Sequence, residues 1–534
     1  MSMTIEGDQG PVTAQATPAE QKDDIAALAK GGRTNVFGFL LRLAARLPFL
    51  FIAGRWYGAD ALGRFAYAVL VVEFVAQIAT LGLKRGLAGA LAQTERPHSH
   101  VVTDAMVVTL IASLLGAGLL IAFPQAMFPN SGINGLDRLL ALIVIAVATS
   151  DVALAACAYR FDIGATVRAR SIIEPWAISI GAFGFAYYSL RDGLILSYVV
   201  SMVAAMIASI IPMWRHYGRP HGWRPDAGRL WRLARRNLPL AAADGVEWGS
   251  RRLDMAILGL FVSPAIVGIY YVAQQVASLP QKLKTSFDPI LGPVITRNLA
   301  EGNLAAIARQ VSQVGFWIIA AQAGIALALG IPGEAVMGLV GPHFVGGTGA
   351  LAFLLAAEVV AATAVVSEAA LIYIARHRNL MISLAMIAVQ ALLSFVLIFA
   401  LHSFADDGAA LRDDKIAAAG PAVALALALA GASIVKAGLL SRLLGAPVSG
   451  WRWPIVWASA AAVVVGETAT RLPEWAELAL GIPATLAVYC AVIWKRGFTE
   501  EDRVLFKRAP ADPARSSAEA PPFRPLSAGS DASR

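Results

Sequence analysis

The stretch NVFGFLLRLAARLPFLFIAG, residues 35–54, is an apolar run interrupted by two arginines, Arg42 and Arg46. Its length suits a helix that crosses the hydrocarbon core of a bilayer, which takes roughly 20 residues. The arginines are one helical turn apart and share a face near mid-membrane. Arginine stays charged there, so a spanning helix tolerates such a pair mainly beside a polar interior or a wet cavity. The stretch therefore predicts a membrane protein with a hydrated cavity.

The composition extends this prediction to the whole chain. Of 534 residues, 57% are hydrophobic and 15% charged, and the mean hydropathy is +0.63. These values exclude a sizeable soluble domain. Both cysteines, Cys157 and Cys490, fall in apolar segments and are interpreted as small buried hydrophobic residues, not as a disulfide or metal pair. The polar N terminus lacks the pattern of a signal peptide, so insertion is expected to depend on the first spanning helix.

Apolar runs bounded by charge, Pro or Gly predict an all-α polytopic membrane protein with about 14 transmembrane helices: two six-helix lobes and two C-terminal helices. The spans are expected near 34–54, 61–83, 102–123, 138–159, 171–189, 193–214, 238–261, 265–281, 307–331, 348–372, 379–401, 416–440, 454–470 and 475–494. The corresponding segments are a cytoplasmic N-terminal segment (1–33), an N-terminal lobe (34–214), a basic cytoplasmic linker (215–237), a C-terminal lobe (238–440), two extra transmembrane helices (441–496) and a disordered cytoplasmic tail (497–534).

The distribution of Lys and Arg supports this register, because basic residues favour the cytoplasmic side of a membrane. With the N terminus inside, 32 of the 44 Lys and Arg are cytoplasmic, five lie within spans and seven lie outside. A missed helix would invert every later loop, so both termini are expected in the cytoplasm. The Arg- and Trp-rich linker 215–237 is interpreted as an amphipathic segment on the anionic inner leaflet, not as a nucleic-acid site. The seven outer residues are Arg55, Arg64, Arg138, Arg191, Arg412, Lys415 and Arg471.

An internal repeat appears when IAGRWYGADALGRFAYAV (52–69) is placed on ILGLFVSPAIVGIYYVAQ (257–274), a shift of 205 residues. Gly54 then matches Gly259, and Gly63 matches Gly268. The copies begin an even number of predicted spans apart and so share one membrane orientation. This predicts two lobes related by an axis along the membrane normal. A chance match in a chain with 47 glycines is the alternative.

Four ionisable residues occupy one face of the predicted seventh span. Asp244, Glu247, Arg251 and Asp254 are spaced by three, four and three residues, which places them in a narrow stripe. Lipid would not solvate these groups, so the stripe is expected to face inward, with Glu247 and Arg251 paired. Arg251 is a candidate for substrate binding and the three acids for cavity or coupling roles; a self-neutralising ion cluster between the lobes is the alternative. Arg252 lies off the stripe and is assigned to helix packing or the outer interface.

The first-span arginines have no acid within their own span, so their counterion is expected on another helix or on an anionic substrate. Arg42 and Arg46 are therefore candidates for substrate binding, although Arg42 can instead extend to the cytoplasmic interface. Further candidates for cavity or coupling roles, each of which can equally be a hydrogen-bonded partner between helices, are Glu73, Glu358, Glu368 and Lys436.

Residues 29–86 resemble the start of the bacterial oligosaccharide-lipid flippases of the polysaccharide and O-antigen type. The shared pattern is a GG…N…G opening, a long first helix, a YG…LG-aromatic turn and an LGL-basic exit. These flippases belong to the multidrug/oligosaccharidyl-lipid/polysaccharide exporter superfamily, with the lipid II flippases and the multidrug and toxin extruders. Beyond position 300 only the architecture matches. The matching residues are Lys30–Gly31–Gly32, Asn35, Gly38, Tyr57–Gly58, Leu62–Gly63–Arg64–Phe65 and Leu81–Gly82–Leu83–Lys84.

The resemblance implies a V-shaped pair of lobes around a cationic cavity. Such a protein carries a glycan on polyprenyl pyrophosphate from the inner to the outer face of the bacterial cytoplasmic membrane, for exopolysaccharide or lipopolysaccharide synthesis. The implied partners are the lipid-linked glycan, membrane lipid and a glycan polymerase or ligase, and the chain is expected to be a monomer. The absence of an acid beside the first-span arginines departs from the lipid II branch.

Three other functions are compatible with parts of the pattern. A multidrug extruder would share the lobes, but a cavity for organic cations is expected to carry acids and aromatic residues instead of uncompensated arginines. A glycan polymerase or ligase is expected to need a large outer loop, and the predicted outer loops are short. A scaffold for glycan-synthesis enzymes would not need buried charge. The sequence has no Ser-His-Asp set, phosphate-binding Gly loop or metal-ligand spacing, so a transporter without cofactor or metal is expected.

Overall fold

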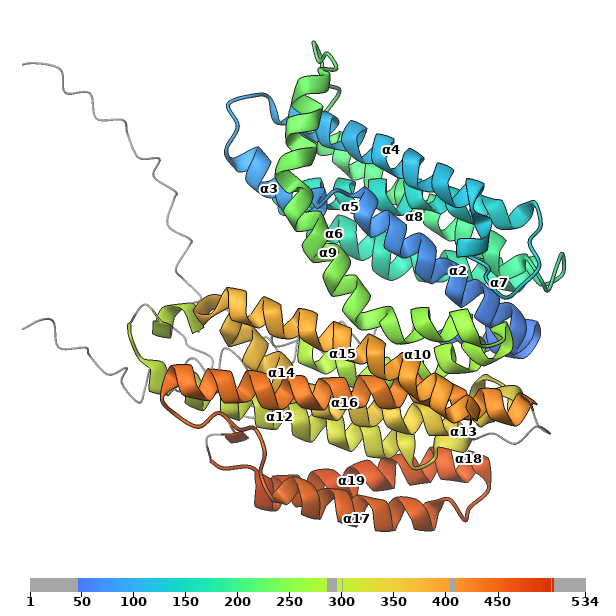
Figure 1. Cartoon of the computed structure of the whole chain (residues 1–534), viewed down its shortest axis with the longest axis vertical. Coiled ribbons are helices and arrows are strands. Elements are labelled where there is room, and N and C mark those ends of the chain that lie inside the picture. The colour runs from blue at the N-terminus through green and yellow to red at the C-terminus, as the bar shows by residue number, and fades with distance from the viewer. Residues whose placement is uncertain (1–46, 286–294, 300, 404–409, 501, 504–534) are drawn as a thin grey trace, which may run out of the picture.

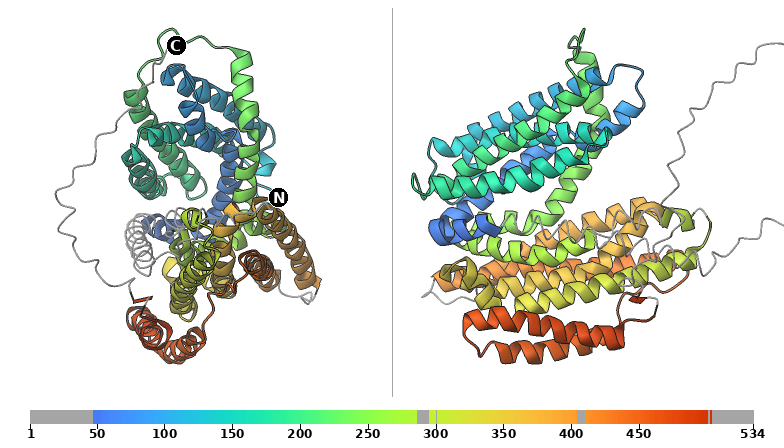
Figure 2. Two further views of the ribbon diagram at one scale, coloured as in Figure 1. Left: turned by 90° about the vertical axis from the view of Figure 1, so that its left-hand side faces the viewer. Right: turned by 180° about the vertical axis from the view of Figure 1, so that it is seen from behind.

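The structure is a computed structural model that describes residues 47–503 except 286–294, 300, 404–409 and 501. The described residues form helices and no β-strand, which confirms the predicted all-α fold. Two bundles of helices lie one above the other, and a long helix, α9, crosses from the upper to the lower bundle (Figure 1). The view along the helices in Figure 2 separates the same two bundles.

The N-terminal lobe is the upper bundle in Figure 1. Its central helix, α2, buries alanines on several sides, and such small side chains let neighbouring helices pack closely in a membrane. A π-helical turn, η1 (Ala53–Tyr57), precedes α2; η3 (Leu136–Leu142) precedes α5, and η4 (Val167–Ile173) leads into α7. The helices of this lobe are α2 (Gly58–Ala79), α3 (Leu83–Ala92), α4 (His98–Ala122), α5 (Ile143–Tyr159), α6 (Ile163–Thr166), α7 (Glu174–Phe185) and α8 (Gly193–Tyr217).

Helix α9 (Ala227–Phe261) is one element of 35 residues. It contains half of the predicted linker as well as the predicted seventh span, so no helix begins at residue 238. The Asp226 side chain caps it by accepting hydrogen bonds from two backbone N–H groups of the first turn. α9 packs against α2, α3 and α4 on one side and against α15 and α16 on the other. The helix therefore connects the lobes along most of its length.

The C-terminal lobe and two last helices complete the chain. Helices α17 and α19 pack on α12, on the side of this lobe that faces away from the N-terminal lobe (Figure 1). Cys157 is buried in α5 as predicted. Cys490 is exposed on α19, because α19 packs through one side only, so the prediction of a buried residue there is wrong. The elements are α10 (Pro264–Thr285), α12 (Leu304–Gly330), α13 (Gly333–Val340), η5 (Pro342–Gly347), α14 (Thr348–Ile374), α15 (Arg376–Ser403), α16 (Ala410–Leu444), α17 (Pro454–Ala469), α18 (Glu474–Ala476), η6 (Glu477–Gly481), α19 (Ile482–Val492) and η7 (Ile493–Gly497).

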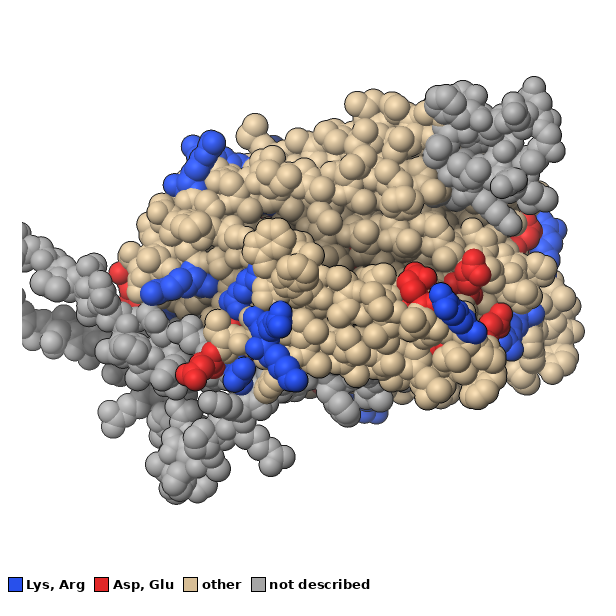
Figure 3. Space-filling model, turned by 90° about the horizontal axis from the view of Figure 1, so that it is seen from below, with Lys and Arg blue, Asp and Glu red and all other residues tan. Residues whose placement is uncertain are grey.

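The helices have the length and surface of a multi-pass membrane protein. In the described part of the chain, nine helical segments are long and apolar enough to cross a membrane. One of them, Leu47–Ala92, includes the end of the predicted first span and all of the second. Each predicted range contains helix, while the exact count of fourteen stays a prediction. Figure 3 shows one face whose charged side chains gather toward its two ends, with a broad uncharged band between them.

Helices α2 and α10 cross in close contact at Gly63 and Gly268, two glycines that the internal repeat pairs. A Cβ added to Gly63 would lie 1.7 Å from the carbonyl oxygen of Pro264, and one added to Gly268 would lie 2.1 Å from that of Ala59. The backbones thus approach too closely for any side chain. Because each lobe contributes the same repeat position to one contact, the geometry favours a true repeat over a chance match.

Two polar contacts join the lobes at the same end of the helices. The Asn130 side-chain amide, from the loop between α4 and α5, donates to the carbonyl oxygens of Gly259 (2.9 Å) and Val262 (3.0 Å) at the end of α9. Carbonyls at a helix C terminus lack intrahelical partners, so Asn130 satisfies groups that would otherwise be open. Arg55 Nε donates to the carbonyl oxygen of Leu339 at 3.1 Å. We call the Gly63–Gly268 crossing and these two contacts the outer seam, because the sequence predicts this end to be outside.

Substitution of Gly268 by valine is expected to open the outer seam. The valine side chain would overlap the backbone of Ala59, so α2 and α10 must separate, at about 1–3 kcal/mol for overpacking. In a protein whose two native cysteines are replaced by serine, a Val262→Cys probe, at a position that is 3% exposed, should react several-fold faster with a thiol reagent. Gly249→Ala is the matched control, because nothing lies within 4 Å of its Cβ. Equal labelling of Gly268→Val and the parent protein would contradict the prediction.

Candidate substrate cavity

A cavity of about 400 Å³ lies between the two lobes. Its walls come from α2, α7 and α8 on one side and from α9, α10, α14 and α16 on the other. Aliphatic and aromatic side chains form the rest of the lining, so the cavity has a mixed polar and apolar wall. The polar and charged lining residues are Glu73, Glu174, Tyr198, Arg251, Arg252, Tyr271, Gln274, Gln275, Ser278 and Glu358.

Two adjacent arginines of α9, Arg251 and Arg252, belong to the cavity wall. The sequence predicts this place for Arg251 but assigns Arg252 to helix packing or the outer interface; the structure puts it in the cavity instead. A helix that crosses between two lobes presents more than one stripe to the space between them, so successive residues can both reach it. The two side chains are 53% and 35% exposed, so neither guanidinium group is sealed off.

Arg252 is paired across the cavity with an acid of the other lobe. Its Nη2 lies 3.5 Å from Oε2 of Glu73 on α2. The hydroxyl of Tyr198, on α8, donates to the other oxygen of Glu73 at 3.1 Å. The sequence-based candidate Glu73 thus lines the cavity and links three helices.

Arg251 belongs to a separate ion cluster. Its Nη2 donates to Glu247 Oε1 at 3.1 Å, the pairing predicted from their spacing. Arg85, at the start of α3, donates to the other oxygen of Glu247 at 2.5 Å and lies 2.8 Å from Asp244, whose second oxygen is 3.6 Å from Lys84 Nζ. Neither Asp244 nor Glu247 is a cavity-lining residue. For these two acids, the alternative of an ion cluster that holds the lobes together describes the geometry better than a cavity role.

Asp254, the last member of the stripe, is fully buried inside the C-terminal lobe. The Tyr270 hydroxyl donates to it at 2.6 Å, and the Gln274 amide approaches the same oxygen at 3.1 Å. Asp254 does not line the cavity, although Gln274 does. The predicted stripe therefore divides into an ion cluster, a cavity arginine and a buried acid that orients a cavity amide.

The remaining candidates separate in the same way. Glu358, on α14, lines the cavity. Glu368, ten residues later, pairs instead with Lys436 of α16 at 2.9 Å, and Lys436 also donates to Ser383 of α15 at 3.0 Å. This pair joins three helices of one lobe away from the cavity lining, as the alternative of an interhelical partner expects.

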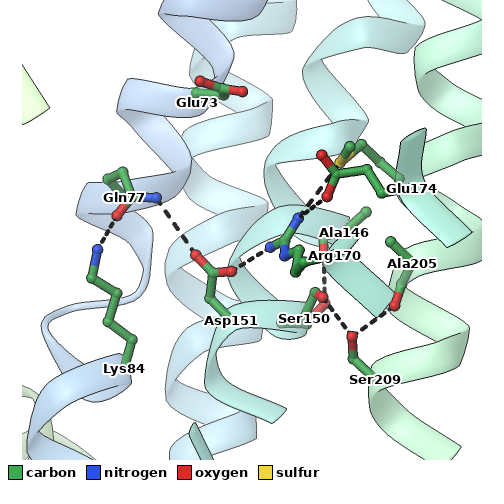
Figure 4. A network of polar contacts seen from close by, with 12 residues as sticks. Glu73, Gln77, Lys84, Ala146, Ser150, Asp151, Arg170, Glu174, Ala205 and Ser209 are labelled. Atoms are coloured by element: carbon green, nitrogen blue, oxygen red, sulfur yellow. Dashed lines mark hydrogen bonds and ion pairs between the residues drawn. The ribbon is translucent and has the colours of Figure 1, made fainter. Parts of the chain in front are cut away.

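A chain of polar contacts runs behind the N-terminal wall of the cavity (Figure 4). Glu174 accepts a hydrogen bond from Arg170 at 3.0 Å, and Arg170 also binds Asp151 of α5. Gln77 approaches Asp151 at 3.5 Å and accepts from Lys84. Arg170 is one of the 32 Lys and Arg that the charge distribution predicts to be cytoplasmic. Its spacing of four residues from Glu174 is the sequence signal that both lie on one helical face.

Arg42 and Arg46 lie outside the described residues. Leu47, Phe49 and Leu50, which follow them directly in sequence, line the cavity. The end of the predicted first span is therefore a cavity wall. In the part of the chain that the structure describes, no group of three or more His, Cys, Asp or Glu is placed to hold a metal ion.

The lining suits a ligand with both anionic and neutral polar parts. Two guanidinium groups next to each other can form bidentate, charge-assisted hydrogen bonds to phosphate oxygens. The amides Gln274 and Gln275 and the hydroxyl of Tyr198 supply donors and acceptors of the kind that sugar hydroxyls bind.

A family model described as "Polysaccharide biosynthesis protein" matches residues 52–318, half of the chain. The chain belongs to this family. The matched range contains helices α2 to α8 of the N-terminal lobe as well as α9 with both cavity arginines. A search of curated protein sequences finds no match for this member of the polysaccharide biosynthesis family.

Solved transporter structures share the fold. A structure described as the inward-facing conformation of a multidrug resistance MATE family transporter of the MOP superfamily matches with a TM-score of 0.59 and 13% identity, covering 78% of this chain and 98% of that one. The structure described as lipid II flippase MurJ in an inward closed conformation matches with a TM-score of 0.61 and 11% identity, covering 86% of this chain and 97% of that one. A MOP superfamily transporter from Pyrococcus furiosus, whose binding pocket is described as having reverse polarity, matches with a TM-score of 0.53 and 13% identity. This match covers 80% of this chain and 96% of that one. This polysaccharide biosynthesis protein thus has the fold of MOP-superfamily transporters, as the resemblance implied.

Proposed function

We propose that the protein is a flippase that moves a polyprenyl-pyrophosphate-linked oligosaccharide from the inner to the outer face of the bacterial cytoplasmic membrane, with both termini in the cytoplasm. The observation that carries the proposal is the position of Arg251 and Arg252 in the wall of a cavity between two lobes. A diphosphate cannot enter hydrocarbon with its hydration intact, and guanidinium hydrogen bonds replace that hydration. The polyprenyl chain stays in lipid while the polar part crosses.

Alternating access follows from the repeat and the outer seam. The lobes pack tightly at the Gly63–Gly268 crossing while a cavity remains between them. This combination supports a state loaded from the cytoplasmic leaflet, from which rocking of the lobes opens the seam and closes the opposite end. A glycan polymerase or ligase is the partner expected to receive the product outside.

A multidrug extruder is the second candidate, because the cavity also carries the acids and tyrosines that an organic cation would use. Two of those acids are already neutralised, however: Glu73 pairs with Arg252, and Glu174 pairs with Arg170. An organic cation would have to displace an arginine from each, whereas an anion needs only to engage the arginines. The charge arrangement therefore favours the anionic cargo.

The test in cells is Arg46→Ala, at the second arginine of the first predicted span. We expect export of the glycan to fall at least about tenfold, as for loss of a charge-assisted contact, while the protein stays inserted and abundant. Mass analysis should find the polyprenyl-linked intermediate accumulated on the cytoplasmic leaflet, as in a clean deletion. Arg309→Ala, at an exposed position away from the cavity, is the control. Normal export in Arg46→Ala would count heavily against the cationic route.

A further inference from the structure

The two cavity arginines differ in whether their acidic partner keeps a second cationic partner once an anion binds the arginine. Glu247 accepts from both Arg251 and Arg85, so it keeps an arginine when Arg251 turns to a ligand. Glu73 is paired with Arg252 and with the neutral hydroxyl of Tyr198. Among the described residues, Glu73 has no second cationic partner within ion-pair distance. Engagement of Arg252 by an anion therefore leaves Glu73 without a neutralising charge.

In the part of the chain that the structure describes, the other cations near Glu73 are already held by other groups. Arg170 is already shared between Asp151 and Glu174, and Lys84 is held by Gln77 and Asp244. Asp254, the next acid on α9, binds Tyr270 and Gln274. The titratable groups that face Glu73 or share its cavity in the described residues are Tyr198 of α8, Arg251 and Arg252 of α9, Tyr271 of α10, Glu174 of α7 and Glu358 of α14.

We propose that binding of a diphosphate at Arg252 releases Glu73, which then takes up a proton, so that each cargo is loaded together with one proton. The inference rests on the proposed function, since it requires the anion at Arg252. The step balances simply: the Glu73 carboxylate and a proton from water give the carboxylic acid, and no bond of the cargo changes. The new O–H can donate to a phosphate oxygen, while Tyr198 keeps its hydrogen bond to the other oxygen of Glu73.

Two physical effects drive this protonation. A carboxylate that has lost its arginine faces the negative charge of the incoming phosphates, and like charges disfavour the ionised form. It is also only 27% exposed, and part of the cavity lining beside it is apolar, so water compensates little. The proton lowers the negative charge that the cargo adds to the cavity. Loading is then linked to pH, and cargo affinity falls as pH rises on the loading side.

The experiment counts protons on the purified full-length protein. The probe is geranyl-pyrophosphoryl-glucose, a soluble diphosphate diester with no group of its own that titrates near neutral pH. Calorimetry at pH 7 in buffers of different protonation enthalpy should give about one proton taken up per probe bound by the wild-type protein. Glu73→Gln should bind the probe with no proton uptake. Glu247→Gln is the matched control and should retain the uptake, because Glu247 keeps Arg85 in the wild-type complex.

A second variant guards against a folding defect in Glu73→Gln. Arg252→Gln removes the arginine of the Arg252–Glu73 pair. The probe can then bind only through Arg251, which requires a higher probe concentration. This binding should no longer change the protonation state of Glu73, so no proton should be taken up. Binding to the wild-type protein without proton uptake, or uptake that persists in Glu73→Gln, overturns the inference and leaves the flippase proposal standing. Failure of the wild-type protein to bind the probe at all overturns the proposed function and the inference together.

Discussion

The double variant Arg251→Ala, Arg252→Ala is expected to bind geranyl-pyrophosphoryl-glucose at least about 100-fold more weakly than the wild-type protein. A hydrogen bond to a charged group contributes about 1.5–3 kcal/mol. Loss of one such bond from each arginine therefore removes roughly 3–6 kcal/mol, and each 1.4 kcal/mol corresponds to about tenfold in affinity. Fluorescence or calorimetric titration of the purified protein measures the dissociation constant directly.

The control must remove two positive charges without touching the cavity. Arg309→Ala with Arg378→Ala does so, because both side chains are exposed and neither lines the cavity. This control should bind the probe as the wild-type protein does. If the cavity double variant also bound with wild-type affinity, α9 would not carry the anion site.

In the proposed cycle Arg251 is paired before the cargo arrives, and this makes release possible. The Arg251–Glu247 pair is exposed on both sides, with Arg251 at 53% and Glu247 at 46%, and such pairs are worth only about 0–1 kcal/mol. The proposed cargo therefore displaces a weak contact when it binds at Arg251. Glu247 can pair with Arg251 again when the cargo leaves.

Local patterns in the sequence predict the features that depend on neighbours along the chain. Hydropathy locates the helices, because a span must be apolar over about 20 residues whatever it packs against. The Glu247–Arg251 pair follows from a spacing of four on one helix. The close crossing of α2 and α10 is foreshadowed by glycines that recur at one shift.

Features that depend on packing between distant segments do not follow from such patterns. Asp244 pairs with Arg85 because α3 packs on α9, and nothing in the spacing of either residue indicates it. Arg252 enters the cavity because α9 crosses between two lobes, which widens the face it presents to the space between them. A count of charges by side likewise treats Arg64 as an outer residue, although it is 5% exposed inside the N-terminal lobe.

Replacement of Asp137 by alanine is expected to lower the free energy of unfolding by about 3–5 kcal/mol, because it leaves a buried arginine without its closest acid. Arg64 on α2 and Asp137 on η3 form a buried ion pair, and Asp137 also accepts from the backbone N–H of Asn134 at 2.7 Å. The next acid, Asp192, is 3.7 Å from Arg64. Unfolding of the purified protein in detergent, followed by heat or denaturant, measures the loss.

Two variants separate the buried charge from other effects. Arg64→Met combined with Asp137→Leu removes both charges and should recover most of the lost stability, because the isolated charge and not the missing pair is the main penalty. Arg191→Ala removes a side chain that is 49% exposed and 3.8 Å from Asp137, and should change the free energy of unfolding by at most about 1 kcal/mol. An Asp137→Ala protein as stable as the wild type would show that the pair is not buried as described.

The Asp137→Ala substitution should also loosen the outer seam. Arg64 donates to the carbonyl oxygen of Gly132, and Asp137 holds Asn134, so the pair fixes both ends of a short segment just after Asn130. Asn130 in turn holds the end of α9 through Gly259 and Val262. Asn130→Ala breaks that contact without exposing or stranding a charge. It should therefore raise thiol labelling of the Val262→Cys probe with little loss of stability. Asp137→Ala should both raise the labelling and lower the free energy of unfolding. Labelling that rises in neither variant would remove this loop from the seam.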